Sequence, residues 1–239
     1  MSHNKYFQFK QFRIEQHQAA MKVNTDGVLL GAWANIEGVS SVLDVGTGTG
    51  LIALMIAQRN QNSFITGIDI DEHAVVEAAE NVRKSPWPHR ISIQHISFQN
   101  FAETNTGKFS LIISNPPFFS NSVKNANTRL SAARHNHLLP FADIISGIRR
   151  MLDEKGHLSI ILPVDEADLF IESASNNGLF LRRIANVKPF PDKEPNRCLM
   201  EFSFLKSETV RTVFSVYNET KLNYSQEFIS LARDFYLKL

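Results

Sequence analysis

The chain has 239 residues, 43% of them hydrophobic, and its 25 Lys and Arg nearly balance its 24 Asp and Glu, which gives a formal net charge of +1. This length supports one large domain with a buried core, and the charge neither requires nor excludes a nucleic-acid partner, because a local basic patch can act on a neutral protein. The single cysteine, Cys198, excludes an intramolecular disulfide. Without a membrane-length apolar run or a signal-peptide core, we expect a cytoplasmic protein.

The N-terminal part of the chain predicts a strand followed by a helix. Aromatic and basic residues interleave there, at Phe7, Phe9, Lys10, Phe12 and Arg13. Such a pattern is typical of sites that stack single-stranded nucleic acid, but it also describes a strand with one buried face, and we favour the strand. A helix is expected from Val28 to Ala34, with Thr25 or Asp26 as its N-cap.

A glycine-rich turn, residues 46–50, lies between an expected strand at 41–45 and an apolar helix that starts at Leu51. The turn has the spacing G-x-G-x-G, and Leu51 stands where the dinucleotide fingerprint requires its third glycine. Glycines at these places let a ligand approach the backbone closely. We therefore expect a cofactor to lie against Gly46, Gly48 and Gly50.

Two acids mark the ends of neighbouring strands. Asp44 precedes the glycine turn. A carboxylate at this position would not help to bind a pyrophosphate, but it can bind the ammonium group of a cofactor. Asp69 ends the next expected strand, 64–69, at the position where a ribose-binding acid is found in doubly wound sheets. The pair predicts a cofactor that carries both an ammonium group and a ribose.

The segment Asn115-Pro116-Pro117-Phe118 follows an apolar strand-like run that ends at Ser114. Consecutive prolines cannot continue a strand, so they form a stiff corner. The corner offers two acceptors, the Asn115 side-chain oxygen and the Pro116 carbonyl, beside the Phe118 ring. These groups are complementary to a planar group with an NH2, such as adenine, although Asn-Pro is also common in ordinary turns.

The remaining pattern alternates strands with helices, as a parallel sheet requires. Helices are expected at 71–84 and 141–152, and further strands at 91–96, 110–114, 157–162, 179–187 and 198–205. The predicted fold is α/β: a doubly wound, seven-stranded, mostly parallel sheet with an antiparallel last strand. The tail should add a strand at 210–217 and a helix at 225–237. We expect one domain over 1–239, with 1–40 as an N-terminal cap and 207–239 as a C-terminal extension.

These motifs resemble those of a known family. The glycine turn is similar to motif I of the class I S-adenosylmethionine-dependent methyltransferases, which have a Rossmann-like fold, and N-P-P-F is similar to their amino-methylating motif. With Phe9-Lys10-Gln11-Phe12, residues 21–33 and Ala133-Arg134-His135, the whole chain resembles the bacterial tRNA1(Val) (adenine(37)-N6)-methyltransferase family. The resemblance implies S-adenosyl-L-methionine as cofactor, the anticodon loop of a tRNA as partner, and methylation of an adenine N6.

The same resemblance implies further contacts to the cofactor, from Thr25, Ile70, Ser97 and Asn115. One departure is visible after the third strand, where many relatives have an Asp near the cofactor adenine and this chain has Ser97-Phe98. A hydroxyl or a backbone N–H would have to make that contact here.

Residues 120–137 follow the corner directly, contain no acid, and include Lys124, Arg129 and Arg134. We expect these three side chains to clamp RNA phosphates, with Lys10 and Arg13 as further candidates; the alternative is a solvated loop. The histidines lack metal-ligand spacing, so no metal site is expected. No obligate protein partner is evident.

Other activities remain open from the residues alone. A protein glutamine N5-methyltransferase or an rRNA guanine N2-methyltransferase would use a similar planar NH2 acceptor. A dehydrogenase is disfavoured by Leu51 in the glycine turn, and a noncatalytic cofactor-binding subunit of an RNA-modifying complex is disfavoured by the intact N-P-P-F.

Overall fold

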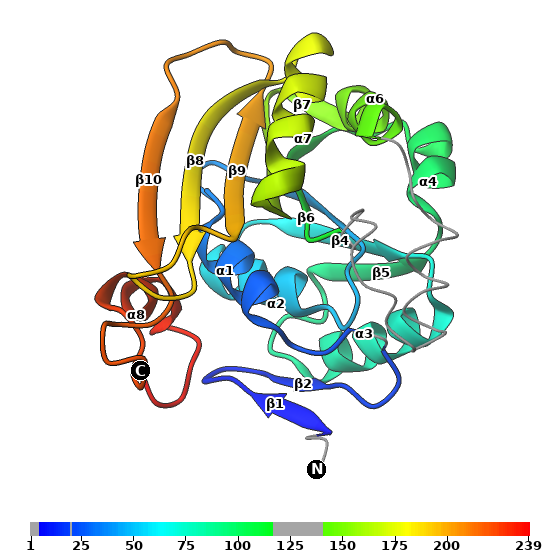
Figure 1. Ribbon diagram of the computed structural model, residues 1–239. Coiled ribbons are helices and arrows are strands. Elements are labelled where there is room, and N and C mark those ends of the chain that lie inside the picture. Colours follow the sequence, from blue (N-terminus) through cyan, green and yellow to red (C-terminus); the bar gives the residue numbers. More distant parts are fainter. Residues whose placement is uncertain (1–4, 20, 117–140) are drawn as a thin grey trace, which may run out of the picture.

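The fold is organised around an eight-stranded sheet in the order β10-β8-β9-β7-β6-β3-β4-β5 (Figure 1). A computed structural model describes residues 5–19, 21–116 and 141–239. Neighbouring strands are parallel except at β9, which is antiparallel to both β7 and β8. The strands are β3 (Ser41–Val45), β4 (Phe64–Asp69), β5 (Ile91–His95), β6 (Phe109–Ser114), β7 (Leu152–Pro163), β8 (Phe180–Lys188), β9 (Arg197–Ser203) and β10 (Val210–Ser215).

Helices cover both faces of this sheet, which is why the central strands β3 and β6 are almost continuously buried. One hydrophobic cluster joins α1, α2 and α8 to one face, and a second joins α4, α6 and α7 to the other. The described helices are α1 (Thr25–Trp33), α2 (Leu51–Arg59), α3 (Glu72–Lys84), α4 (Phe98–Thr104), α6 (Phe141–Met151), α7 (Val164–Asn176) and α8 (Gln226–Ala232). The predicted doubly wound, mostly parallel α/β fold is confirmed.

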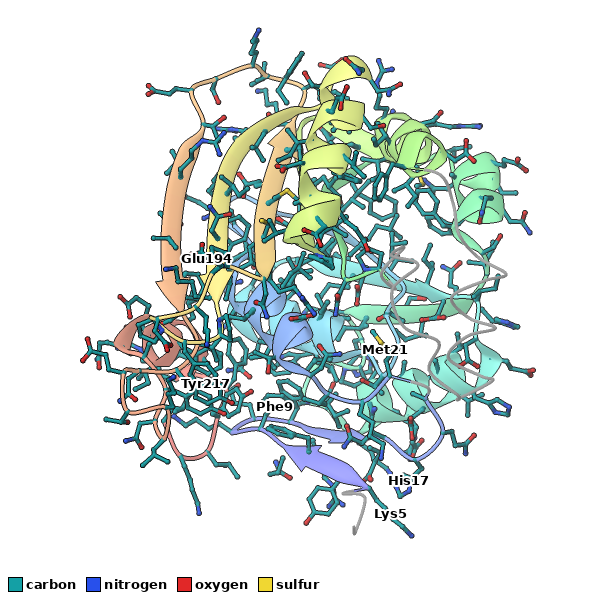
Figure 2. All side chains as sticks on the ribbon, viewed as in Figure 1. Lys5, Phe9, His17, Met21, Glu194 and Tyr217 are labelled. Carbon is teal, nitrogen blue, oxygen red and sulfur yellow. The ribbon has the colours of Figure 1, made fainter. Side chains whose placement is uncertain are left out.

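The N-terminal segment forms a small hairpin of β1 (Tyr6–Gln8) and β2 (Arg13–Glu15). Phe9 and Phe12 are buried, and Phe9 makes an isolated bridge to Tyr236 near the C-terminus. Figure 2 shows Phe9 between the hairpin and the body of the protein. The burial expected of these aromatic side chains is confirmed, but the single strand was wrong, because Phe9 and Phe12 lie in the connection between two short strands.

Four details differ from the sequence-based expectation. The tail strand β10 pairs in parallel with β8 and so enlarges the seven-stranded sheet to eight strands. Strand β7 starts at Leu152, earlier than expected, and α8 ends at Ala232, short of 237. The N-cap of α1 is Asn24, whose side chain accepts from Gly27 N at 2.8 Å, so the predicted caps Thr25 and Asp26 were wrong.

Cys198 lies in β9 and is buried, and burial raises the pKa of its thiol to about 11. Among the described residues, no helix combines the length and the hydropathy that crossing a bilayer demands.

Candidate active site

The site lies where β3, β4 and β6 end side by side. Asp44 pairs in register with Gly67 of β4 and with Ile113 of β6, so the residues that follow these strands emerge at one edge of the sheet. Ser114 Oγ donates to Val45 O at 2.9 Å and ties two of these strand ends together. In open α/β sheets this carboxyl edge is the usual place for ligands.

The glycine turn folds back over the end of β4. Gly46, Gly48 and Gly50 have φ values of 71°, 57° and 80°. These values lie in the left-handed region, which residues with a side chain rarely adopt. The amide of Gly46 donates to Ile68 O at 2.9 Å, and that of Gly48 donates to Asp69 Oδ2 at 2.8 Å. A Cβ at position 46 or 48 would meet no atom within 4 Å, whereas one at position 50 would lie 3.5 Å from Ala78 Cβ. Gly46 and Gly48 therefore border open space, and Gly50 packs against α3.

Asp44 is fully buried, and its two carboxylate oxygens differ in their surroundings. Oδ2 accepts from Thr47 Oγ1 at 2.7 Å and from Ala53 N at 3.2 Å. Oδ1 has no hydrogen-bond partner among the described residues. Burial raises the pKa of this carboxyl to about 7, against the opposing effect of the two hydrogen bonds. A buried carboxylate oxygen with free capacity fits the ammonium group of the expected cofactor.

Each carboxylate oxygen of Asp69 accepts a hydrogen bond from a backbone amide. Oδ2 accepts from Gly48 N at 2.8 Å, and Oδ1 accepts from Asp71 N at 3.0 Å. Burial raises its pKa, and these hydrogen bonds lower it by less. Because a carboxylate has about four acceptor positions, Asp69 retains capacity for two ribose hydroxyls while it holds the glycine turn in place.

The other predicted cofactor residues lie at the ends of strands or at the starts of helices. The Ile70 side chain is 43% exposed after the end of β4, and its carbonyl lies 3.0 Å from His95 Nε2. Ser97 is the N-cap of α4 and accepts from Asn100 N at 3.2 Å. Thr25 is the first residue of α1 and is exposed. Their roles toward a cofactor stay predictions.

Asn115 stands at the corner after β6, with only 8% of its surface exposed and no partner for Oδ1 among the described residues. Gly27 of α1 approaches it closely: a Cβ at position 27 would lie 3.9 Å from Asn115 Nδ2 and 3.0 Å from Leu51 Cδ2. Sequence reasoning missed Gly27, whose only signal was a glycine in the first turn of an otherwise apolar helix. Pro116 completes the described part of the corner.

Several predicted residues fall elsewhere. Phe118, Lys124, Arg129 and Arg134 lie outside the described residues. Lys10 Nζ donates to Arg233 O at 2.5 Å. The Arg13 guanidinium stacks 3.5 Å above the Tyr6 ring and pairs with Glu15 at 3.1 Å. Lys10 and Arg13 thus both have partners within the protein, on the hairpin and not among the three strand ends.

One ion pair joins the edge of the sheet to α1. Asp26 Oδ2 accepts from Arg197 Nε at 2.9 Å, at the start of β9. The sequence predicts Asp26 as a possible N-cap and does not indicate its pairing with Arg197. Within 5–19, 21–116 and 141–239, no group of three or more His, Cys, Asp or Glu side chains is arranged to hold a metal ion.

Comparison with known proteins agrees with this geometry. Residues 27–163 match the family described as Methyltransferase small domain. A tRNA1(Val) (adenine(37)-N6)-methyltransferase of Pseudoalteromonas translucida (strain TAC 125) is 42% identical over 233 residues, 98% of this chain and 99% of the relative. A protein of the same name from Christiangramia forsetii is 43% identical over 239 residues, 99% of each chain.

Solved structures share the fold at low sequence identity. A predicted O-methyltransferase from Agrobacterium tumefaciens has a TM-score of 0.65 at 17% identity, over 88% of this chain and 96% of that one. A putative RNA methyltransferase from Pyrococcus horikoshii has a TM-score of 0.55 at 18% identity, over 78% and 86%. These structures establish the class I methyltransferase fold, and the near full-length relatives establish more: the chain belongs to the tRNA1(Val) (adenine(37)-N6)-methyltransferase family.

Proposed function

We propose that this protein transfers the methyl group of S-adenosyl-L-methionine to the N6 amino group of an adenine in tRNA. Adenine 37 of tRNA1(Val) is the target that the names of its relatives give. The observation that carries the proposal is Asn115 Oδ1, a buried acceptor with no partner among the described residues, at the carboxyl edge beside the glycine turn. An acceptor left unpaired in the protein is costly unless a ligand donates to it.

The cofactor side of the site rests on the two acids. S-adenosyl-L-methionine, when bound, supplies a methyl group that its sulfonium already activates. The unpartnered Oδ1 of Asp44 would hold the ammonium group, and the remaining acceptor positions of Asp69 would take the ribose hydroxyls. The open space over Gly46 and Gly48 lets a ligand lie against the backbone. The task of these residues is to orient the methyl group toward the acceptor nitrogen.

The acceptor side rests on the corner. The exocyclic nitrogen of adenine is a poor nucleophile because its lone pair is delocalised into the ring. One N–H donating to Asn115 Oδ1 and the other to the Pro116 carbonyl would favour a pyramidal nitrogen and aim its lone pair. Both acceptors also stabilise the positive charge that develops during attack. The proton of the methylated amine is acidic enough to leave to water, so no side chain is assigned as a general base.

The test is methylation of a defined tRNA, read by mass spectrometry of its nucleosides. Purified protein and S-adenosyl-L-methionine should produce N6-methyladenosine in unmodified tRNA1(Val), and a transcript with guanine at position 37 should stay unmethylated. The Asn115→Ala variant should give almost no product. Methylation of a guanine amino group, or of protein glutamine with no methyl in the tRNA, would refute the proposal and favour the corresponding alternative.

A further inference from the structure

Asn81, on the second half of α3, joins three separate parts of the chain. Its Oδ1 accepts from Glu15 N at 2.8 Å, and its Nδ2 donates to Glu15 O and to Thr49 O, both at 3.0 Å. Only 1% of Asn81 is exposed. One buried amide therefore connects the end of β2, the helix α3 and the glycine turn, and both of its N–H groups are used.

Glu77 lies one turn earlier on the same face of α3. Its carboxylate accepts hydrogen bonds from three consecutive backbone amides that follow β2: His17 N, Gln18 N at 3.2 Å and Ala19 N at 2.9 Å. Glu77 is 7% exposed. A carboxylate that collects backbone N–H groups in this way replaces the regular structure that the segment lacks.

The segment held by Glu77 and Asn81 leads into helix α1. Gln16 Oε1 accepts from Val23 N at 2.9 Å and so brings the two ends of the segment together. Asn24 then caps α1 through Gly27 N at 2.8 Å, and Gly27 packs beside Asn115. In Figure 2 the segment runs from His17, at the lower edge of the view, to Met21 near the centre.

We propose that Glu77 and Asn81 are positioning residues for cofactor binding. They fasten residues 15–19 to α3, and Asn81 also fixes the Thr49 carbonyl at the end of the glycine turn. Without Asn81, Thr49 O and both backbone groups of Glu15 lose their buried partners, and the turn and the N-terminal segment must shift or admit water to satisfy them. The inference rests on the proposed function in one respect, the identity of the cofactor.

The first test is calorimetry of S-adenosyl-L-methionine binding to the full chain. Asn81→Ala should raise the Kd about tenfold, which corresponds to about 1.4 kcal/mol, while turnover at saturating cofactor is retained because the reacting groups are untouched. Glu77→Gln should also raise the Kd, since one amide oxygen cannot accept from all three backbone N–H groups. This second variant keeps the test decisive if Asn81→Ala does not fold.

Asn60→Ala is the matched control. Asn60 Nδ2 donates to Ile36 O at 3.1 Å and to Val39 O at 2.8 Å, and its Oδ1 accepts from Ser63 N at 3.1 Å. The chemistry is that of Asn81, but Asn60 follows α2 and lies before β4, at the opposite edge of the sheet from the site. Asn60→Ala should lower the thermal stability and leave the Kd unchanged. Equal loss of affinity in the two alanine variants would reduce Asn81 to a general stabilising role and overturn the inference.

Hydrogen exchange without cofactor gives a readout that does not depend on the proposed function. Asn81→Ala should speed exchange both at Glu15 and in the turn 46–50, whereas Glu77→Gln should speed it at Gln18 and Ala19. If the Asn81→Ala variant bound the cofactor with wild-type affinity, the inference would be overturned. Unchanged hydrogen exchange in the turn 46–50 of this variant would overturn it as well. A wild-type protein that does not bind S-adenosyl-L-methionine would refute the proposed function instead, and the exchange experiment would still decide whether Asn81 couples the two segments.

Discussion

Asp44→Asn should make the folded protein more stable above neutral pH while removing most of its affinity for S-adenosyl-L-methionine. The carboxylate is fully buried, and one of its oxygens has no partner among the described residues. An amide has nearly the same shape, and its oxygen can still accept from Thr47 Oγ1 and Ala53 N. The substitution therefore removes the buried negative charge and keeps the two hydrogen bonds that orient the side chain.

The size of the effect follows from the pKa of Asp44. Burial raises this pKa from 3.8 to about 7. Between those values the folded protein binds a proton that the unfolded chain has released, so the free energy of unfolding falls as the pH rises through this window. At about 1.4 kcal/mol for each pKa unit, the penalty is complete above pH ~7 and amounts to roughly 4 kcal/mol. The amide does not titrate, so Asp44→Asn escapes this penalty.

The assay is urea unfolding of both proteins without cofactor, at about pH 4 and about pH 8. The stability difference should be small at the lower pH, where Asp44 is largely neutral, and should favour the variant by up to roughly 4 kcal/mol at the higher pH. Calorimetry should show that wild-type affinity for S-adenosyl-L-methionine falls as the pH drops below about 7, because the neutral carboxyl no longer attracts the ammonium. A variant that is less stable than wild type at about pH 8, or that binds the cofactor normally, would refute the reasoning.

Three further variants test the other predicted functional residues. Asn115→Ala should lower turnover by about 10²–10³-fold and leave cofactor affinity near wild type, as measured by calorimetry beside single-turnover methylation; full turnover at saturating tRNA would make the corner structural. Asp69→Ala should weaken cofactor binding by about 1–3 kcal/mol through the lost ribose hydrogen bonds, and a calorimetric response to NAD instead of S-adenosyl-L-methionine would contradict the assignment. A triple alanine variant of Lys124, Arg129 and Arg134 should bind tRNA with a salt slope shallower by roughly two units, and an unchanged slope would show that these side chains are not the phosphate clamp.

The strand ends of the site could be predicted from the sequence because parallel strands place their carboxyl ends at one edge. Asp44, Asp69 and Asn115 each follow a short apolar run, and their meeting needs no knowledge of side-chain packing. The close approach of a ligand to the glycine turn could also be predicted, because glycine is the residue that most readily adopts positive φ. These features depend on local sequence and on the geometry common to all such sheets.

Other features depend on tertiary contacts that local sequence does not contain. Asn24, Thr25 and Asp26 are all good N-caps by residue type, and residue type alone does not indicate that Asn24 takes the position and accepts from Gly27 N. A strand at 210–217 was expected, but a tail strand can pair with either edge of a sheet or with none. Its parallel pairing with β8 is a property of the assembled fold.

Polar residues on the buried face of α3 show most clearly what local sequence alone does not predict. Glu77 and Asn81 stand four residues apart on an amphipathic helix, and by type they belong on its solvated side. They are buried because the N-terminal segment covers them, and Asn81 meets Glu15 across 66 residues of sequence. That segment has little regular structure of its own, so its backbone amides must find acceptors elsewhere. One of the two side chains that supply those acceptors, Asn81, also donates to Thr49 O, and this contact links the position of residues 15–19 to the glycine turn.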